Sequence, residues 1–230
     1  MTIHRFFVRP DEATGDRFAL PASIRRQVRT VLRLGDGDHI VILTGDGDEA
    51  VCRLAADECL VEERRPAVAE PVHRLTVVQA LLKGDGLEEV VQRGTEVGVA
   101  AFRLAVSERC VARDMSPRKL DRLRAVARES AEQSERGRVP DVHEPAPLRS
   151  LLAPAAVLLY ERADGRQRLG EVRVPATIII GPEGGFTPGE VERAEDAGVV
   201  VAGLGPRILR SPTVAPAAAA VILSRTGDFA

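Results

Sequence analysis

Two glycine-rich segments are the parts of this sequence best suited to bind a small molecule. The first, Gly-Pro-Glu-Gly-Gly-Phe-Thr at 181–187, directly follows the apolar run 178–180. The second, at 203–213, also lies between an apolar run and a predicted helix. Glycines let backbone N–H groups come close to a ligand, and open α/β sheets bind ligands at the carboxyl ends of their strands. We therefore expect the two segments to form one shared pocket.

Neither segment matches the common nucleotide-binding motifs. The sequence has no Gly-Lys-Ser/Thr of a phosphate-binding loop and no G-x-G-x-x-G dinucleotide fingerprint. Taken alone, the glycines indicate only a ligand at a strand end. The alternative is a tight turn that packs against the sheet, which the same turn-forming residues also favour.

Alternating strands and helices from residue 75 onwards should position both segments. Apolar runs predict strands at 75–82, 101–106, 156–160, 176–180 and 199–202. Periodic apolar positions and capping residues predict helices at 87–97, 116–133, 187–198 and 213–223. This alternation is typical of an α/β fold, a mostly parallel sheet with helices on both faces.

The first part of the chain has a different pattern. Asp-Gly turns at 35–38 and 45–48 bound strand candidates at 39–43 and 49–54, which is typical of hairpins. A helix is expected at 21–34. Its inward residues would be Ile24, Val28, Val31 and Leu32.

A charged stretch with two prolines, 62–71, is interpreted as a linker between domains. Before this stretch the sequence predicts short hairpins, and after it the sequence predicts alternating strands and helices. We therefore predict a small β-barrel-like domain at 1–68 and a larger α/β domain at 73–230.

The bulk composition restricts how this chain could bind nucleic acid. It is 44% hydrophobic and 29% charged with a net charge of −2, so nucleic-acid binding would need a local basic face. The helix at 21–34 offers one, because it contains four arginines and no acid. A solvated charged face is the alternative interpretation.

Two classes of protein, membrane-spanning proteins and metalloproteins, are disfavoured by the sequence. No apolar run reaches the roughly 18 residues of a membrane helix, so a cytoplasmic protein is expected. The three cysteines and four histidines lack metal-ligand spacing, and we predict no metal.

The two glycine segments, taken together, resemble a known family. Residues 181–186 followed by 204–210 are similar to the SPOUT superfamily, and more narrowly to the branch that methylates N3 of a uridine in 16S ribosomal RNA. The resemblance runs from about residue 3 to about 225. Further segments that fit this branch are 4–8, 82–85, 92–99, 107–110 and 132–136.

This resemblance implies a fold, a cofactor and partners. It implies a trefoil-knotted C-terminal domain, a PUA-like N-terminal domain, a homodimer, S-adenosylmethionine bound in the knot, and the small ribosomal subunit with its 16S RNA as substrate. The cofactor contacts it implies are Gly181, Glu183, Gly184, Gly185, Leu204, Gly205, Ile208, Leu209 and Ser211.

The chain departs from the family pattern at Pro212, where relatives usually have Glu. An acidic base at that position is therefore excluded here. Arg210 is a candidate catalytic residue, because a fixed cation could stabilise the uracil anion that forms when N3 is methylated. The alternative for Arg210 is an ion pair with a surface carboxylate. The predicted RNA contacts are Arg5, Arg25, Arg26, Arg29, Arg33, Arg93 and Arg136.

Two alternative functions stay open at this point. One is a SPOUT enzyme that methylates a different RNA position, such as a ribose hydroxyl or a transfer RNA base. The other is an RNA-binding assembly factor with a vestigial cofactor pocket, which the loss of Glu at Pro212 favours.

Overall fold

The structure is a computed structural model that describes residues 3–161 and 166–229, and the chain divides into two compact units. The first unit comprises Met1–Glu70 and Ala131–Val139, and the second comprises Pro71–Ser130 and Pro140–Ala230. No helix within the described ranges is long and apolar enough to cross a membrane.

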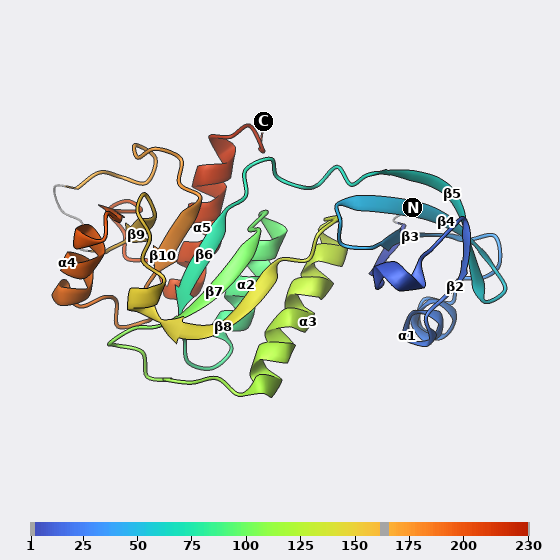
Figure 1. Cartoon of the computed structure of the whole chain (residues 1–230), viewed down its shortest axis with the longest axis horizontal. Coiled ribbons are helices and arrows are strands. Elements are labelled where there is room, and N and C mark those ends of the chain that lie inside the picture. Colours follow the sequence, from blue (N-terminus) through green and yellow to red (C-terminus); the bar gives the residue numbers. More distant parts are fainter. Residues whose placement is uncertain (1–2, 162–165, 230) are drawn as a thin grey trace. The chain divides into compact units, whose positions relative to one another are not determined.

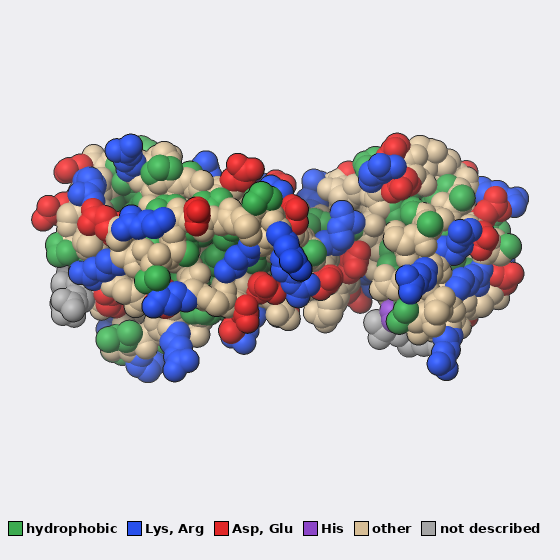
Figure 2. Space-filling model, turned by 90° about the horizontal axis from the view of Figure 1, so that it is seen from below, with side chains coloured by type: hydrophobic (Ala, Val, Ile, Leu, Met, Phe, Trp, Pro, Cys, Tyr) green, Lys and Arg blue, Asp and Glu red, His purple; other side chains and the backbone are tan. Residues whose placement is uncertain are grey.

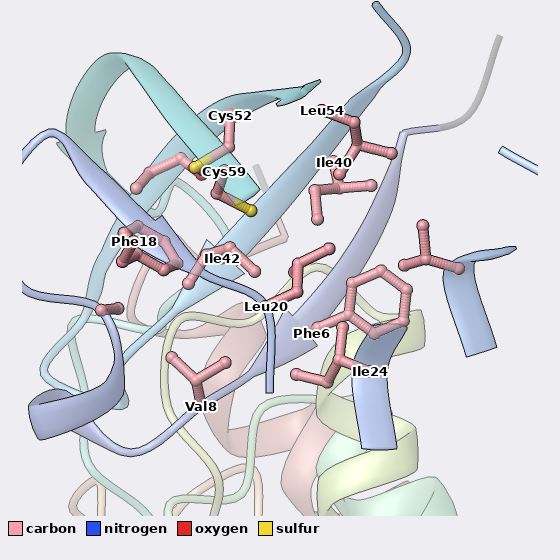
Figure 3. Close-up of a cluster of buried hydrophobic side chains, with 13 residues drawn as sticks. Phe6, Val8, Phe18, Leu20, Ile24, Ile40, Ile42, Cys52, Leu54 and Cys59 are labelled. Carbon is pink, nitrogen blue, oxygen red and sulfur yellow. Dashed lines mark hydrogen bonds between the residues drawn. The ribbon is translucent and has the colours of Figure 1, made fainter. Parts of the chain in front are cut away.

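The first unit is built on a five-stranded sheet with the order β1-β3-β4-β5-β2, in which only the β1–β3 pair is parallel (Figure 1). Its core is a cluster of buried side chains that includes Phe6, Phe18, Ile40 and Leu54 (Figure 3). Its elements are β1 (His4–Phe7), η1 (Pro10–Glu12), β2 (Arg17–Ala19), α1 (Ala22–Arg26), η2 (Gln27–Val31), β3 (His39–Leu43), β4 (Asp48–Ala55) and β5 (Glu58–Pro66). The strand predictions at 39–43 and 49–54 are confirmed as β3 and β4.

The linker prediction at 62–71 is wrong over its first half. Residues 62–66 belong to β5, which pairs with β4 from Glu58 to Pro66 with one β-bulge at Glu62. Their charges are accommodated by ion pairs between the strands. Glu62 Oε1 accepts from Arg53 Nε at 2.9 Å, and Glu49 Oε1 accepts from Arg65 Nε at 2.7 Å. Charged side chains that face solvent are compatible with a strand when the opposite strand supplies the counter-charge.

The helix predicted at 21–34 forms, but its inward face differs from the prediction. Ile24 and Val28 are buried and Leu32 packs against the core, whereas Val31 is 70% exposed. The second half of this helix, η2, is a π-helix. A wider turn places inward positions four residues apart, so 24, 28 and 32 face the core and 31 does not.

The second unit is a six-stranded sheet with the order β11-β9-β10-β6-β7-β8, and every pair in it is parallel (Figure 1). This confirms the predicted α/β fold. The elements are β6 (Thr76–Ala80), α2 (Gly86–Glu96), β7 (Ala101–Val106), α3 (Pro117–Gln133), β8 (Asp141–Pro147), η3 (Leu148–Ser150), β9 (Val157–Leu159), β10 (Thr177–Ile180), α4 (Pro188–Asp196), β11 (Val200–Ala202) and α5 (Ser211–Ser224).

Strand β8 was not predicted, because the sequence there contains Pro145 and Pro147. Proline cannot donate a ladder hydrogen bond and is tolerated at the edge of a sheet. β8 is the edge strand beside β7, which explains how these prolines are accommodated.

The two faces of this sheet are covered by different helices. Val78, Leu158 and Ile179 pack on one face with Val191 of α4. On the other face, Phe102 of β7 lies so close to Gly94 of α2 that a Cβ there would be 2.7 Å from the ring. Helix α5 packs beside α2. The sheet therefore lies between two layers of helices. The loops that follow the carboxyl ends of its strands are placed where open α/β sheets bind ligands.

The last turn of α3 belongs to the first unit. Ala131 packs in a cluster with Phe7, Val41 and Leu43, and Glu132 Oε1 accepts a hydrogen bond from Phe7 N at 2.9 Å. The first unit is therefore made from two separate stretches of chain, which the local sequence pattern did not indicate.

Candidate functional site

A cavity of about 720 Å³ opens at the carboxyl ends of β9 and β10. Its walls include loop 1, residues 181–187 after β10, and loop 2, residues 203–210 after β11. Its volume lies within the range of small-molecule sites. Ten of the sequence-predicted residues line it, namely Gly181, Glu183, Gly184, Gly185, Leu204, Gly205, Ile208, Leu209, Arg210 and Ser211.

Loop 1 is held by residues from neighbouring loops. Glu183 Oε1 accepts from the backbone N of Lys83 at 2.9 Å, and the carbonyl of Gly184 accepts from Arg109 Nη1 at 2.8 Å. Gly185 has a φ of +67°, and a Cβ there would lie 2.6 Å from Oε1 of Glu161. Glycine at 185 therefore permits both the left-handed turn and the close approach of the Glu161 carboxylate.

The helix that follows loop 1 begins with the predicted capping box. Thr187 Oγ1 accepts from the backbone N of Glu190 at 3.2 Å, and Glu190 Oε2 accepts from the backbone N of Thr187 at 2.9 Å. The Thr187 hydroxyl also donates to Glu108, which pairs with Arg193. The Thr187 hydrogen bond, followed by that of Arg193, lowers the pKa of the Glu108 carboxyl. These bonds fix where loop 1 ends.

Loop 2 offers backbone donors that no described residue of the protein uses. Among residues 3–161 and 166–229, the N–H groups of Leu204, Gly205, Arg207, Ile208 and Leu209 have no hydrogen-bond partner. The side chain of Ile208 is 84% exposed, which is unusual for a large aliphatic residue. Free donors beside exposed apolar surface are expected where a partly polar ligand is to be bound.

Residues 69–223 match the model of the RNA methyltransferase domain family. The chain belongs to this family. Two relatives called ribosomal RNA small subunit methyltransferase E support the assignment. The chain is 32% identical over 218 residues to that of Bacillus subtilis, with 85% of each protein covered. It is 36% identical over 226 residues to that of Mycobacterium tuberculosis, with 86% of this chain and 81% of the relative covered.

A solved structure of another family member has the same fold. It is the ribosomal RNA small subunit methyltransferase E of Neisseria gonorrhoeae bound to S-adenosyl methionine, at 28% identity and a TM-score of 0.89. The superposition covers 97% of this chain and 98% of the other. The putative methyltransferase Lpg2936 of Legionella pneumophila shares the fold at a TM-score of 0.85 and 24% identity.

The cavity of this RNA methyltransferase suits S-adenosylmethionine chemically. Leu159, Ile180 and Leu209 give apolar surface for a purine ring. The free amides of loop 2 can bond its heteroatoms, and the carboxylates of Glu161 and Glu183 can face hydroxyls or a sulfonium charge.

Arg210 lies on the cavity wall immediately before α5. Its side chain is exposed, and it has no ion pair among the described residues. The alternative interpretation, an ion pair with a surface carboxylate, is therefore not observed among the described residues. Its backbone is fixed, because its carbonyl accepts from Thr213 N at 2.8 Å.

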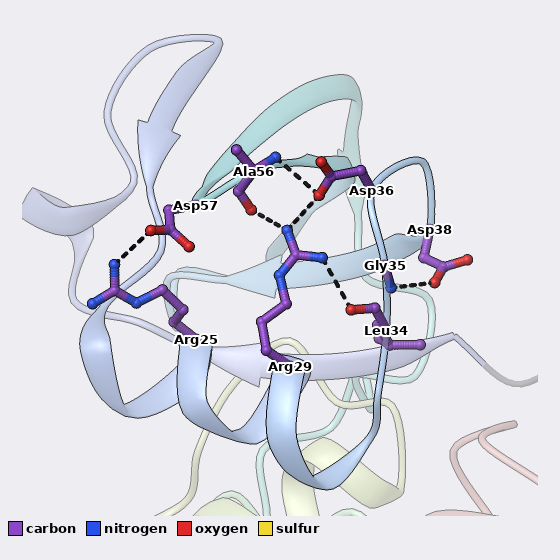
Figure 4. Close-up of polar contacts among 8 residues, drawn as sticks. All are labelled: Arg25, Arg29, Leu34, Gly35, Asp36, Asp38, Ala56 and Asp57. Carbon is purple, nitrogen blue, oxygen red and sulfur yellow. Dashed lines mark hydrogen bonds and ion pairs between the residues drawn. The ribbon is translucent and has the colours of Figure 1, made fainter.

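The prediction of an uninterrupted basic face on the first helix is wrong, because acids from other elements reach it. Arg25 Nη1 pairs with Asp57 at 2.9 Å, and Arg29 Nη2 pairs with Asp36 at 2.6 Å (Figure 4). Arg29 also donates to the carbonyls of Leu34 and Ala56. On the face drawn in Figure 2, cationic and anionic side chains are interspersed.

The other predicted RNA contacts differ in accessibility. Arg136 is 2% exposed and paired with Glu70. Its prediction as an RNA contact is therefore wrong, and its role is structural. The Arg5 side chain is 11% exposed and pairs with Glu135 at 3.0 Å and Glu49 at 3.7 Å. Arg93 is exposed and pairs with Glu89. Arg26 and Arg33, the remaining predicted RNA contacts, are exposed and have no carboxylate partner among the residues described.

Some residues around the cavity were missed. Glu161 follows β9 and lines the wall, and its position directly after a predicted strand could have identified it. Gln79 is polar within the apolar run 75–82 and is fully buried, which is also a recognisable signal. Arg109 lies in the segment 107–110 that fits the family, but its contact with Gly184 could not have been predicted, because it depends on how the loops meet.

Proposed function

We propose that this chain transfers a methyl group from S-adenosylmethionine to N3 of a uridine in the 16S ribosomal RNA of the small ribosomal subunit. The observation that carries the proposal is the meeting of the two glycine loops in one cavity of about 720 Å³. The shared fold with a relative bound to S-adenosyl methionine supports the cofactor. Relatives called ribosomal RNA small subunit methyltransferase E support the substrate.

The residues around the cavity have distinct roles in this proposal. Loop 1, loop 2 and Ser211 hold the cofactor through backbone groups and short side chains. When bound, S-adenosylmethionine supplies an electrophilic methyl group. Uracil N3 gives up its proton to solvent water, and Arg210 stabilises the negative charge that then spreads to the neighbouring carbonyl oxygens. N3 takes up the methyl carbon as the bond from that carbon to sulfur breaks, and the bonding pair stays on sulfur, so the products are 3-methyluridine and S-adenosylhomocysteine.

We further infer the finer architecture that the family resemblance implies. The first unit is a PUA-like barrel that binds RNA, and the second is a SPOUT domain whose chain forms a trefoil knot around the cofactor. The described sheets and the TM-score of 0.89 over 97% of the chain support both. A crystal structure of the protein with S-adenosylmethionine tests the knot, because an unknotted trace would contradict it.

The protein is also proposed to act as a cytoplasmic homodimer. In the run 215–220 of α5, the small residues Pro216, Ala217 and Ala220 are partly exposed and permit the close approach of a second helix, whereas the other three alanines are buried within the second unit. Light scattering coupled to size exclusion tests this assembly. A monomeric mass at micromolar concentration would contradict it.

The activity is tested with labelled methyl donor, purified small subunits and naked 16S RNA. We expect label in the RNA, a reverse-transcription stop at one uridine, and 3-methyluridine in the nucleoside digest, since N3 methylation removes a base-pairing donor. Label on a ribose or on another base would contradict the assigned position. Tight cofactor binding without label in either RNA would contradict the enzymatic proposal. An absence of cofactor binding would favour an assembly factor with a vestigial pocket.

A further inference from the structure

Gln79 is a polar side chain at the centre of an apolar strand. It lies in β6, between β10 and β7, and its side chain is fully buried. Its neighbours Val77, Val78 and Ala80 are apolar and buried too. A buried amide is costly unless each of its polar atoms has a partner, so its presence requires an explanation.

The amide nitrogen of Gln79 joins the two cofactor loops. Nε2 lies 3.3 Å from the carbonyl oxygen of Gly181 in loop 1 and 3.0 Å from Oγ of Ser211, directly after loop 2. The carbonyl oxygen of Ala80 also lies 3.1 Å from Nε2, so the two N–H groups of the amide are shared among three acceptors. The carbonyls of Gly181 and Ala80 can only accept, which fixes the orientation of the amide with its nitrogen towards the loops.

Ser211 completes this arrangement. Its hydroxyl donates to the same Gly181 carbonyl at 2.7 Å, while its oxygen accepts from Gln79. Gly181 and Ser211 both line the cavity, whereas Gln79 does not. Any effect of Gln79 on a bound ligand must therefore pass through these two residues.

The other end of the amide is not satisfied. Oε1 of Gln79 is buried and has no hydrogen-bond partner among the residues described. An unpaired buried carbonyl costs stability, and an apolar side chain of similar volume would avoid that cost. The residue at 79 is therefore not the one that would make the fold most stable.

We propose that Gln79 is a positioning residue that sets the spacing between loop 1 and loop 2 for the cofactor. The proposal rests on the cofactor site assigned under the proposed function. The proposal explains why a glutamine is present although its Oε1 has no partner. An apolar side chain would avoid the unpaired oxygen, but it could not make the Nε2 contacts that join the two loops. Loops held at a fixed separation do not have to be ordered by the ligand when it binds.

The test compares Gln79→Leu and Ser211→Ala with the wild-type protein by calorimetry with S-adenosylmethionine and by thermal unfolding. Ser107→Ala is the matched control, because Ser107 is equally buried but does not line this cavity. We expect about a tenfold rise in Kd for Gln79→Leu with an unchanged or higher Tm. The KM for the cofactor should rise by a similar factor while kcat on small subunits changes little.

The double variant makes the test specific. Because both side chains act on the Gly181 carbonyl, the double variant should weaken binding less than the product of the two single effects. Multiplicative effects would overturn the proposal, as would a wild-type Kd in Gln79→Leu. A Tm that falls in parallel with affinity in both single variants would indicate a structural role and overturn it too. A wild-type protein that binds no S-adenosylmethionine would overturn the cofactor assignment itself, and the inference with it.

Discussion

The backbone N–H of Lys83 donates a hydrogen bond to Oε1 of Glu183 at 2.9 Å, joining two loops that are 100 residues apart in the sequence. Lys83 follows β6 and Glu183 follows β10, which are adjacent strands of the parallel sheet. The carboxylate of Glu183 is thereby part of the cavity wall and also a support for it.

Replacing Glu183 should weaken cofactor binding, and it should do so most when the new side chain can no longer accept the hydrogen bond from the backbone N of Lys83. Glu183→Ala removes the acceptor and should raise the Kd for S-adenosylmethionine about tenfold, since a backbone donor loses its partner. Glu183→Gln retains a neutral acceptor and should have a smaller effect. Calorimetry measures both, and Glu192→Ala, an exposed carboxylate of α4, is the control. Equal affinity in Glu183→Ala and the wild type would contradict this role.

Arg210 should affect the chemical step more than cofactor binding. Arg210→Ala is expected to lower kcat by about 10²–10³, the usual cost of removing a group that stabilises transition-state charge. The Kd for S-adenosylmethionine should change by less than threefold, because the cofactor is held mainly by backbone groups. Single-turnover methylation of small subunits measures the rate, and Arg210→Lys should recover part of it. Wild-type turnover in Arg210→Ala would refute the assignment.

Arginines that lack a carboxylate partner should contribute most to RNA affinity. We expect the variants Arg26→Ala and Arg33→Ala each to weaken binding to 16S RNA and to reduce the slope of log K against log salt by about one. Arg25→Ala is the matched control on the same helix, because Asp57 already neutralises Arg25. Filter binding at several salt concentrations gives the slopes. Identical slopes for all three variants would argue against RNA contact by this helix.

The Glu108 carboxylate should make the stability of the folded protein vary with pH in the acidic range. Hydrogen bonds from Thr187 and Arg193 lower its folded-state pKa below its ordinary value of 4.5. A lowered pKa contributes stability above pH 4.5, and this contribution is lost as pH falls through the folded-state value. The difference in Tm between wild type and Glu108→Gln should therefore be largest near neutral pH and shrink below about pH 4.5. A difference that does not vary with pH would contradict the prediction.

Local patterns were sufficient to predict most of the second unit. The Thr187–Glu190 capping box, the start of α3 at Pro117 and strand β7 lie where the residue types indicate. These features depend on neighbours within a few residues, so the sequence contains their causes. The two glycine loops could be predicted to meet because parallel strands end at one edge of a sheet.

Features that depend on distant residues could not be predicted. The acids that neutralise Arg25 and Arg29 are Asp57 and Asp36, which lie outside the predicted helix 21–34. Whether they reach its arginines depends on how the turn and strands that follow the helix fold. Strand β5 looked like a linker because its second half is charged, and the counter-charges come from Arg53 and Glu49 of the neighbouring strand β4. The π-helical turn at 27–31 has no clear signal in residue type, yet it turns Val31 outwards.

The contribution of 131–139 to the first unit affects how this protein can be divided or exchanged with relatives. A fragment that ends at residue 70 would lack Glu132, the acceptor for Phe7 N, and Ala131, which packs against Phe7 and Leu43. Recombination at a single crossover near residue 70 would join residues 1–70 from one parent to residues 131–139 from the other. Chimeras should therefore fold best when residues 131–139 are inherited together with residues 1–70.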